Sequence, residues 1–176
     1  DTGNKRDVSR YIELPFSLYR ESPLWVPPFI DEVRTQLDSS RHPFYQHSTA
    51  AFFLALEGDK TVGRIAVLDN ARYNQHHKDK ERTAFFYHFD CVDDLAVSRA
   101  LFDAAFDWAR GRGLNKMWGP QSFVAADGKG LLIEGFEHRP ALGIAYNYPY
   151  YGGLVEDAGF EKGVDLVSCH MDRQTD

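Results

Sequence analysis

The chain has 176 residues, of which 43% are apolar and 26% are charged, close to the average for globular proteins and unlike disordered or collagen-like chains. Its 20 basic and 26 acidic residues leave a net charge of −6, which argues against the basic surface that nucleic-acid binding needs. The longest wholly apolar run covers residues 50–56, far short of the ~20 residues that cross a bilayer, so we expect no membrane span.

Cysteine content and the chain start point to a cytoplasmic protein. Cys91 and Cys169 form no CxxC pair, so we expect neither a disulfide framework nor a cysteine-rich zinc site, and a reducing compartment is the default. The chain starts at Asp1 rather than at a methionine, and no apolar signal core follows. We therefore expect a cytoplasmic location and a chain that is a piece of a longer protein.

The first quarter of the sequence predicts two helices on either side of a proline-rich turn. Residues 11–19 carry apolar side chains at helical spacing, although Pro15 lies inside this stretch. The Trp25-Val26-Pro27-Pro28 run is expected to be extended, because residues before proline are disfavoured in helices. A second helix is predicted over residues 28–37, followed by an extended segment at 43–45.

The middle of the sequence predicts a β-hairpin and a central strand. Two apolar runs, 51–56 and 61–68, are joined by the turn residues Glu57-Gly58-Asp59-Lys60. Residues 69–82 are polar and predict a loop with one helical turn. Residues 83–92 are apolar on both faces and predict a third strand inside the sheet.

The second half predicts a long helix followed by less regular structure. The helix begins at Asp93-Asp94, has a broad apolar stripe and ends near Arg110, before two glycines. The predicted elements after it are a strand at 116–119, an irregular loop at 121–145, a short helix at 149–158 and a last strand at 164–171. This order predicts an α+β fold with α/β-like layering, in which a mixed sheet carries helices on both faces.

Several short strings resemble the GNAT superfamily of acyl-CoA N-acyltransferases. They are the second-hairpin sequence Glu57-Gly58-Asp59-Lys60-Thr61-Val62-Gly63-Arg64-Ile65, the helix end Trp108-Ala109-Arg110-Gly111-Arg112-Gly113, and Ala158-Gly159-Phe160-Glu161-Lys162. Further strings are similar to the N-terminal part of longer bacterial GNAT-like proteins: Trp25-Val26-Pro27-Pro28, Pro43-Phe44, Gly119-Pro120, and Tyr146-Asn147 with Tyr150-Tyr151.

This resemblance implies one GNAT-like domain over residues 1–176 with a mostly antiparallel sheet. Within it we expect a helical leading segment at 1–45 and a sheet core at 46–176 that includes the irregular 121–145 loop. The resemblance also implies acyl-CoA as co-substrate, a small-molecule amine as acceptor, and a further C-terminal domain or a second copy of the chain as partner.

The resemblance places a CoA site at the end of the third strand. In the superfamily, backbone groups there polarise the thioester carbonyl, which points to Cys91 and Val92. The following helix start holds the pyrophosphate on free amides, and the superfamily pattern (Gln or Arg, two residues, Gly, one residue, Gly or Ala) falls on Asp93, Ala96 and Ser98.

Two acidic residues depart from that pattern. Asp93 and Asp94 put negative charge where a diphosphate would bind, and two like charges 4 Å apart repel by roughly 4 kcal/mol at an effective dielectric near 20. Arg99 would offset part of this repulsion. The alternative is that one aspartate simply caps the helix. Asn147 is a further candidate for cofactor contact or for capping.

The candidate catalytic residues are Tyr151, His88 and Asp90. Many superfamily members have a tyrosine four residues before the Gly-Phe pair that protonates the CoA thiolate, but that position here is Val155. Tyr151 lies one turn earlier on nearly the same face, either as a replacement or as ordinary aromatic packing. His88 and Asp90 alternate on one side of the third strand as candidate general bases, unless His88 is only a buried, hydrogen-bonded strand residue.

Other reactive residues carry weaker predictions. Glu134 in the long loop is a secondary candidate base. His76-His77 are adjacent and lack metal-ligand spacing, so we expect no metal. Cys91 lies among aspartates that disfavour its thiolate and is expected to be a packed residue. The sequence thus predicts an N-acyltransferase that uses acyl-CoA and a primary amine; the alternative is a non-catalytic GNAT-like module that binds a ligand or packs against a partner domain.

Overall fold

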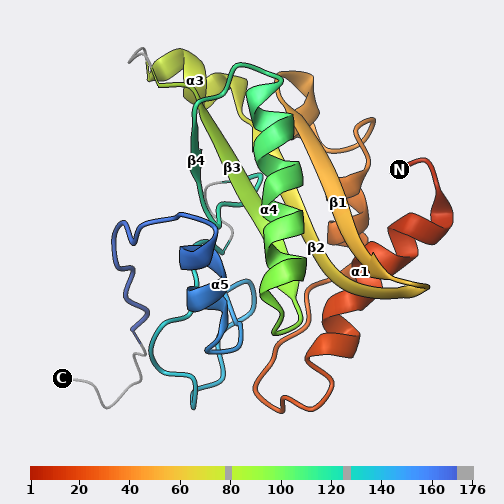
Figure 1. The fold of residues 1–176 in the computed structure, drawn as a ribbon, viewed down its shortest axis with the longest axis vertical. Helices are drawn as coiled ribbons and strands as arrows, with labels where there is room; N and C mark the ends of the chain where they lie inside the picture. Colours follow the sequence, from red (N-terminus) through yellow and green to blue (C-terminus); the bar gives the residue numbers. More distant parts are fainter. Residues whose placement is uncertain (78–80, 125–127, 170–176) are drawn as a thin grey trace.

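A computed structural model describes residues 1–77, 81–124 and 128–169 (Figure 1). The elements in chain order are α1 (Lys5–Leu18), α2 (Ile30–Leu37), the 3₁₀ turn η1 (Pro43–Gln46), β1 (Thr49–Glu57), β2 (Lys60–Asp69), α3 (Ala71–His76), β3 (Thr83–Cys91), α4 (Leu95–Arg110), β4 (Lys116–Trp118) and α5 (Tyr151–Asp157). Among the described residues, no helix is both long and apolar enough to cross a membrane.

The four strands form one mixed, mostly antiparallel sheet in the order β1-β2-β3-β4. The β1–β2 and β2–β3 pairs are antiparallel, and the short β4 runs parallel to β3. The predicted hairpin, the third strand and the mixed sheet are confirmed. β2 and β3 are buried along most of their length because they lie inside the sheet and helices cover them.

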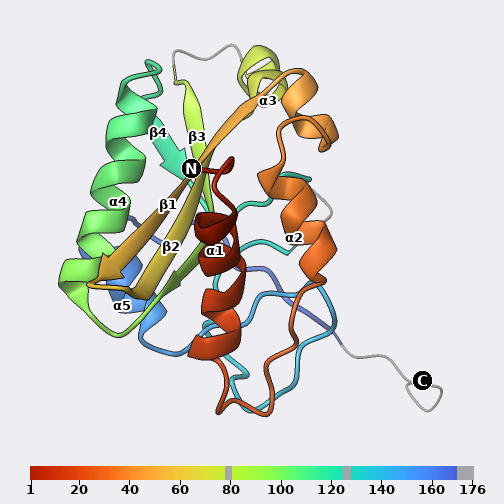
Figure 2. The same ribbon diagram turned by 90° about the vertical axis from the view of Figure 1, so that its right-hand side faces the viewer.

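Helices cover both faces of the sheet. α4 packs on one face with α5 beside it, while α1 and α2 lie on the other face (Figure 2). The core beneath α4 joins Ile65 and Phe86 of the sheet to Leu101 and Phe102 of the helix. Close packing depends on Gly63, where a Cβ atom would lie 2.7 Å from Leu101 Cδ1. The layers expected from the order of the elements are present.

The first helix tolerates Pro15 because another donor replaces the missing proline N–H. In a regular helix, residue 15 would donate to the carbonyl of Tyr11 four residues earlier, and proline has no N–H for this bond. Here Arg64 donates instead, with its NH1 atom 2.6 Å from the Tyr11 carbonyl oxygen. α1 therefore continues to Leu18, and an arginine of β2 holds it to the sheet.

Three predicted elements differ from the structure. The second helix begins at Ile30 rather than at residue 28, because the chain stays extended through Phe29, its N-terminal capping residue. The segment at 43–45 is a 3₁₀ turn rather than extended, and the His42 ring accepts a bond from the Phe44 N–H. The described part of the predicted last strand, residues 164–169, pairs with no described strand, and Val164 and Val167 are exposed.

Candidate functional site

His88 lies at a β-bulge in the central strand β3. Between the pairs Arg64–Asp90 and Ala66–Tyr87 the register shifts, so that β3 carries one residue more than β2. His88 takes up this extra residue with φ of 48°, in the left-handed region that residues other than glycine rarely adopt. At the bulge four consecutive residues, 87–90, line one cavity, and both predicted bases, His88 and Asp90, are among them.

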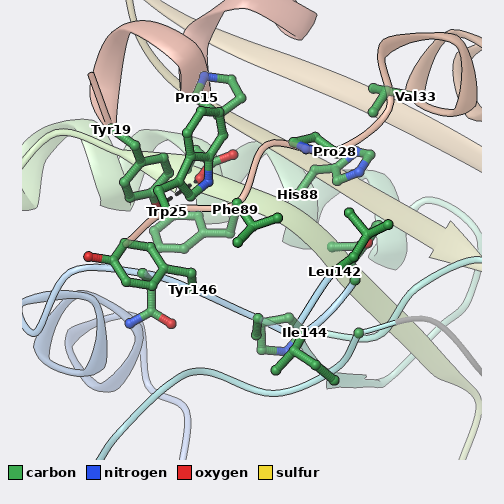
Figure 3. Close-up of a pocket in the computed structure, with 18 of the residues that line it drawn as sticks. Pro15, Tyr19, Trp25, Pro28, Val33, His88, Phe89, Leu142, Ile144 and Tyr146 are labelled. Atoms are coloured by element: carbon green, nitrogen blue, oxygen red, sulfur yellow. Dashed lines mark hydrogen bonds between the residues drawn. The ribbon is translucent and has the colours of Figure 1, made fainter. Parts of the chain in front are cut away.

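The cavity is about 390 Å³ and lies between the N-terminal helical segment, the β3 bulge and the 128–147 segment. Most of its wall is apolar or aromatic. Figure 3 shows Tyr19, Trp25 and Tyr146 grouped together, with the Tyr19 and Trp25 rings stacked 5.3 Å apart. The polar residues in its wall are Glu32, Gln36, Arg64, His88, Asp90 and Asn147. Such a volume and lining are typical of a small-molecule site.

A buried ion pair stands at the edge of this cavity. The Asp90 carboxylate accepts from Arg64 Nε and NH2, both at 2.7 Å, and the two residues are only 8% and 4% exposed. The Tyr19 hydroxyl lies 3.1 Å from the other carboxylate oxygen. Because these partners already bond both oxygens of Asp90, its geometry suits orienting neighbouring groups better than the uptake of a substrate proton.

His88 differs from Asp90 in having an unpartnered ring nitrogen. Its Nδ1 is buried and makes no hydrogen bond in the structure. Burial, reinforced by the Arg64 charge, lowers the pKa of His88 well below its usual 6.5, so the imidazole is neutral at pH 7. The neutral imidazole is the form that a general base needs, although the same shift makes His88 a weaker base than a free histidine. The predicted alternative, a buried His88 with satisfied hydrogen bonds, does not describe this nitrogen.

Tyr151 is wholly buried and does not line the cavity. Its hydroxyl accepts from the Cys91 N–H at 3.2 Å and lies 2.8 Å from the Tyr19 hydroxyl. Burial and the nearby Asp90 carboxylate raise the pKa of Tyr151 well above its usual value. The neighbouring Tyr150 donates to the Cys91 carbonyl at 2.8 Å. Both main-chain groups of Cys91 are thus engaged by α5.

The Cys91 side chain is an inert packed thiol. It is buried, and burial together with the adjacent aspartates raises the pKa of the thiol to about 12. Val92 continues the strand pairing, because its N–H donates to the Val62 carbonyl at 3.0 Å.

The start of α4 does not fit a diphosphate group. Asp94 is the N-cap, and its Oδ1 accepts from the N–H groups of Ala96 at 2.7 Å and Val97 at 3.3 Å. Its carboxylate therefore fills the position that an anion would take at these amides. Arg99, expected to offset the charge, instead makes a double contact of 2.7 Å with Asp157.

The other residues predicted to bind cofactor also have internal partners. Ser98 is fully buried, with its hydroxyl 3.4 Å from the Leu154 carbonyl. The buried Asn147 amide accepts from the Leu132 N–H and donates to the Leu132 and Tyr148 carbonyls. CoA binding at these residues stays a prediction, and their arrangement speaks against it.

The remaining sequence candidates lie elsewhere. Glu134 is exposed and does not line the cavity. His76 and His77 are exposed, with their Nδ1 atoms against the carbonyls of Arg72 and Tyr73. The described residues contain no group of three His, Cys, Asp or Glu side chains placed to hold a metal ion.

Sequence reasoning missed Arg64 and Gln36. Arg64 lies in an otherwise apolar strand, and a single charged residue in such a strand indicates a buried ion pair. Gln36 follows Glu32 by one helical turn, so both lie on one face of α2, but nothing in the sequence indicates that this face lines a cavity.

The sheet, its covering helices and the bulged central strand define a GNAT-like acetyltransferase fold. Among solved structures, the chain is similar to a protein titled "Putative acetyltransferase from Agrobacterium tumefaciens str. C58", with a TM-score of 0.53 and 15% identity. The likeness covers 97% of this chain and 96% of that one, and at this identity it establishes the fold alone.

Two curated proteins match almost the whole chain in sequence. Protein YghO of Escherichia coli (strain K12) is 36% identical over 171 residues, which is 97% of this chain and 43% of that protein. The bacterial ceramide synthase of Caulobacter vibrioides (strain NA1000 / CB15N) is 32% identical over 173 residues, 97% of this chain and 44% of that protein. The chain thus spans less than half the length of these relatives. No family model matches it.

Proposed function

We propose that this protein transfers an acyl group from acyl-CoA to a primary amine and that the described cavity receives the amine acceptor. The observation that carries the proposal is His88, which lines a 390 Å³ cavity, is neutral, and has a buried Nδ1 without a hydrogen-bond partner. The GNAT-like fold supports acyl transfer, and so does the relative named a ceramide synthase, since ceramide is an N-acylated amine.

In this proposal the cavity binds the amine and His88 removes a proton from its nitrogen. A protonated amine has no lone pair with which to attack a carbonyl, so this proton has to leave before or during amide formation. Asp90 lies on the same wall, but its carboxylate is already bonded by Arg64 and Tyr19, so we do not assign it the role of the base.

The acyl-CoA site is a separate part of the proposal. The Asp94 carboxylate holds the helix-start amides of α4, so we assign no CoA contact to this helix. The curated relatives are more than twice as long as the chain, which leaves room in them for a second module. We propose that such a module holds the acyl-CoA.

The test is acyl transfer by the complete protein that carries this chain. Purified wild type is incubated with acetyl-CoA or palmitoyl-CoA and a panel of primary amines, and free thiol and amide product are both measured. We expect turnover that falls about 10²- to 10⁴-fold in His88→Gln, the usual contribution of a general base. His76→Gln, an exposed histidine of α3, is the matched control and is expected to keep full activity.

The second candidate is a non-catalytic GNAT-like module that binds a ligand. The Asp94 cap and the buried Tyr151 hydroxyl favour it. They accept from the N–H groups of Ala96 and Cys91, which an acyltransferase of this superfamily would present to CoA. If the protein binds an amine but forms no amide with either acetyl-CoA or palmitoyl-CoA, this candidate is supported and the first is overturned.

A further inference from the structure

The strand β1 forms one edge of the sheet, and its outer side is open. In the order β1-β2-β3-β4 it pairs with β2 alone (Figure 1). In an antiparallel pair, every second residue turns its main-chain N–H and C=O away from the neighbouring strand. Within the described residues, no other segment forms a hydrogen bond with the main chain of β1. Along its nine residues, Thr49–Glu57, the outer side of β1 thus presents a row of main-chain donors and acceptors.

This edge lacks the features that usually keep an edge strand from pairing. Native sheets protect such strands by making them short, by placing charged side chains or proline in them, or by bulges. β1 has no charged residue and no proline between Thr49 and Leu56, and its register shift with β2 places the extra residue, Val62, on β2. The opposite edge strand, β4, is only three residues long. We therefore expect the β1 edge to be covered in the complete protein.

A groove of about 250 Å³ lies along the outer side of β1. Phe52 and Leu54 pack toward α1 and α2, whereas Phe53 packs toward α4, and all three line this groove. Side chains from the two faces of a strand meet at its edge, so the groove lies where a neighbouring strand would lie. The other apolar residues of its wall are Leu56 of β1, Val8 and Tyr11 of α1, and Leu37 of α2. α1 and α2 therefore extend over this position.

The lining of the groove indicates what fits it. Apart from Asp1, Thr2 and Asp7 the wall is apolar, so the side chains that fill it are apolar too. At about 30 Å³ for each group of water's size, 250 Å³ has room for roughly eight non-hydrogen atoms, or about two aliphatic side chains. A β-strand combines such side chains with main-chain groups that complete the hydrogen bonds of an edge strand.

The length of the relatives favours a strand from the same polypeptide. Both curated relatives are more than twice as long as the chain, so a protein of their length has further residues that can supply a strand. A strand of the same polypeptide is held at high effective concentration and covers the edge in every molecule. A second copy of the chain would leave the edge open in dilute protein, and β1 has no protection against unwanted pairing there.

We propose that β1 is the docking edge for a fifth strand, which the part of the complete protein outside residues 1–176 supplies. The added strand bonds to the outward main-chain groups of β1, extends the sheet, and places apolar side chains in the groove beside α1. The groove and the cavity share no lining residue, so this inference does not depend on the proposed acyl transfer.

The experiment measures amide hydrogen exchange in the complete protein that carries this chain, at single-residue resolution. With a fifth strand in place, all β1 amides from Ala50 to Leu56 are expected to exchange at least about a hundredfold more slowly than in the urea-unfolded protein. Fast exchange at every second residue of β1, with slow exchange at the residues bonded to β2, overturns the inference. The amides of β2, which is paired on both sides, are the internal control and should exchange slowly in either case.

Dilution and one substitution test the source and the contact. Protection of β1 that stays constant over a hundredfold range of protein concentration supports a strand of the same polypeptide, and protection that disappears on dilution identifies a second copy and overturns the proposal. Leu56→Lys puts a charge into the groove at a side chain that is 48% exposed, and we expect the outward β1 amides to exchange about tenfold faster. Leu142→Lys, a similarly exposed position away from this groove, is the matched control and should leave them unchanged. Equal exchange in the two variants would reject the groove as the docking surface.

Discussion

The hydroxyl groups of Tyr19 and Tyr151, 132 residues apart in the sequence, lie 2.8 Å from each other beside the Asp90 carboxylate. Tyr19 follows α1 and Tyr151 begins α5, so this contact joins helices from opposite faces of the sheet at one buried point. Both side chains are almost fully buried. The end of α1 is thereby bonded to the sheet and to α5 through specific polar contacts as well as apolar packing.

The first prediction concerns the role of Tyr151. Tyr151→Phe removes the acceptor of the Cys91 N–H and is expected to lower the free energy of unfolding by about 1–3 kcal/mol, the cost of a buried donor left unpaired. It is expected to leave kcat within a few-fold of wild type, because the hydroxyl does not face the cavity. Urea unfolding and steady-state kinetics measure the two effects. A large loss of kcat with normal stability would instead support the predicted acid role.

The second prediction concerns the buried ion pair. Arg64→Leu leaves Asp90 as an unpaired buried charge and removes the donor of the Tyr11 carbonyl, so we expect a loss of about 3–5 kcal/mol in unfolding free energy. Arg34→Leu breaks an exposed pair with Asp31 and is expected to change stability by less than about 1 kcal/mol. Equal losses in the two variants, measured by chemical denaturation, would contradict this assignment.

The third prediction concerns the cap of α4. Asp94→Ala removes the acceptor of two helix-start amides and is expected to cost about 1 kcal/mol. Asp93→Ala, next to it and exposed, is expected to stay within about 0.5 kcal/mol of wild type. Thermal unfolding of both variants checks the difference, and a reversed order would mean that Asp93 rather than Asp94 stabilises this helix.

The fourth prediction follows from His88. Its folded-state pKa lies well below the unfolded value of 6.5, so below pH 6.5 the unfolded chain binds a proton that the folded chain does not. The comparison variant is His88→Asn, because asparagine tolerates the positive φ of this position. The unfolding free energy of wild type, relative to that of the variant, should therefore fall as the pH drops below 6.5. If His88 stays neutral in the folded state down to pH 5, the loss of unfolding free energy at that pH is at most about 2 kcal/mol. Urea titrations from pH 7 to pH 5 measure the difference, and parallel curves for the two proteins would refute the shift.

Regular elements were predictable where one periodic pattern dominates. The apolar runs around the Gly58 turn gave the hairpin, and the broad stripe behind Asp94 gave α4 and its cap. The sequence does not show why α1 tolerates Pro15, because the donor that replaces the proline N–H comes from β2, 53 residues away in the chain. No local pattern contains that contact.

The candidate site was predictable only in part, because strand alternation shows neither the bulge at His88 nor the partners of Asp90. His88 and Asp90 were found from strand alternation, yet the extra residue at His88 leaves one nitrogen unpartnered while Arg64 and Tyr19 bind the carboxylate. Gln36 escaped notice because no local pattern shows that its face of α2 lines a cavity. Tyr151 was placed on the correct helix, but only its contacts show that its hydroxyl supports Cys91.

The side-chain amide of Asn147 forms hydrogen bonds with both main-chain groups of Leu132, so these bonds close the loop between the two residues. Leu142 and Ile144, which shape the outer wall of the cavity, lie within this loop. Insertions there leave the anchoring bonds and the sheet untouched, and doubling a loop's length costs only about 0.6 kcal/mol in closure entropy. We therefore expect a change in the length of this loop to alter the capacity of the cavity more than it alters the positions of Arg64 and Asp90 on the sheet.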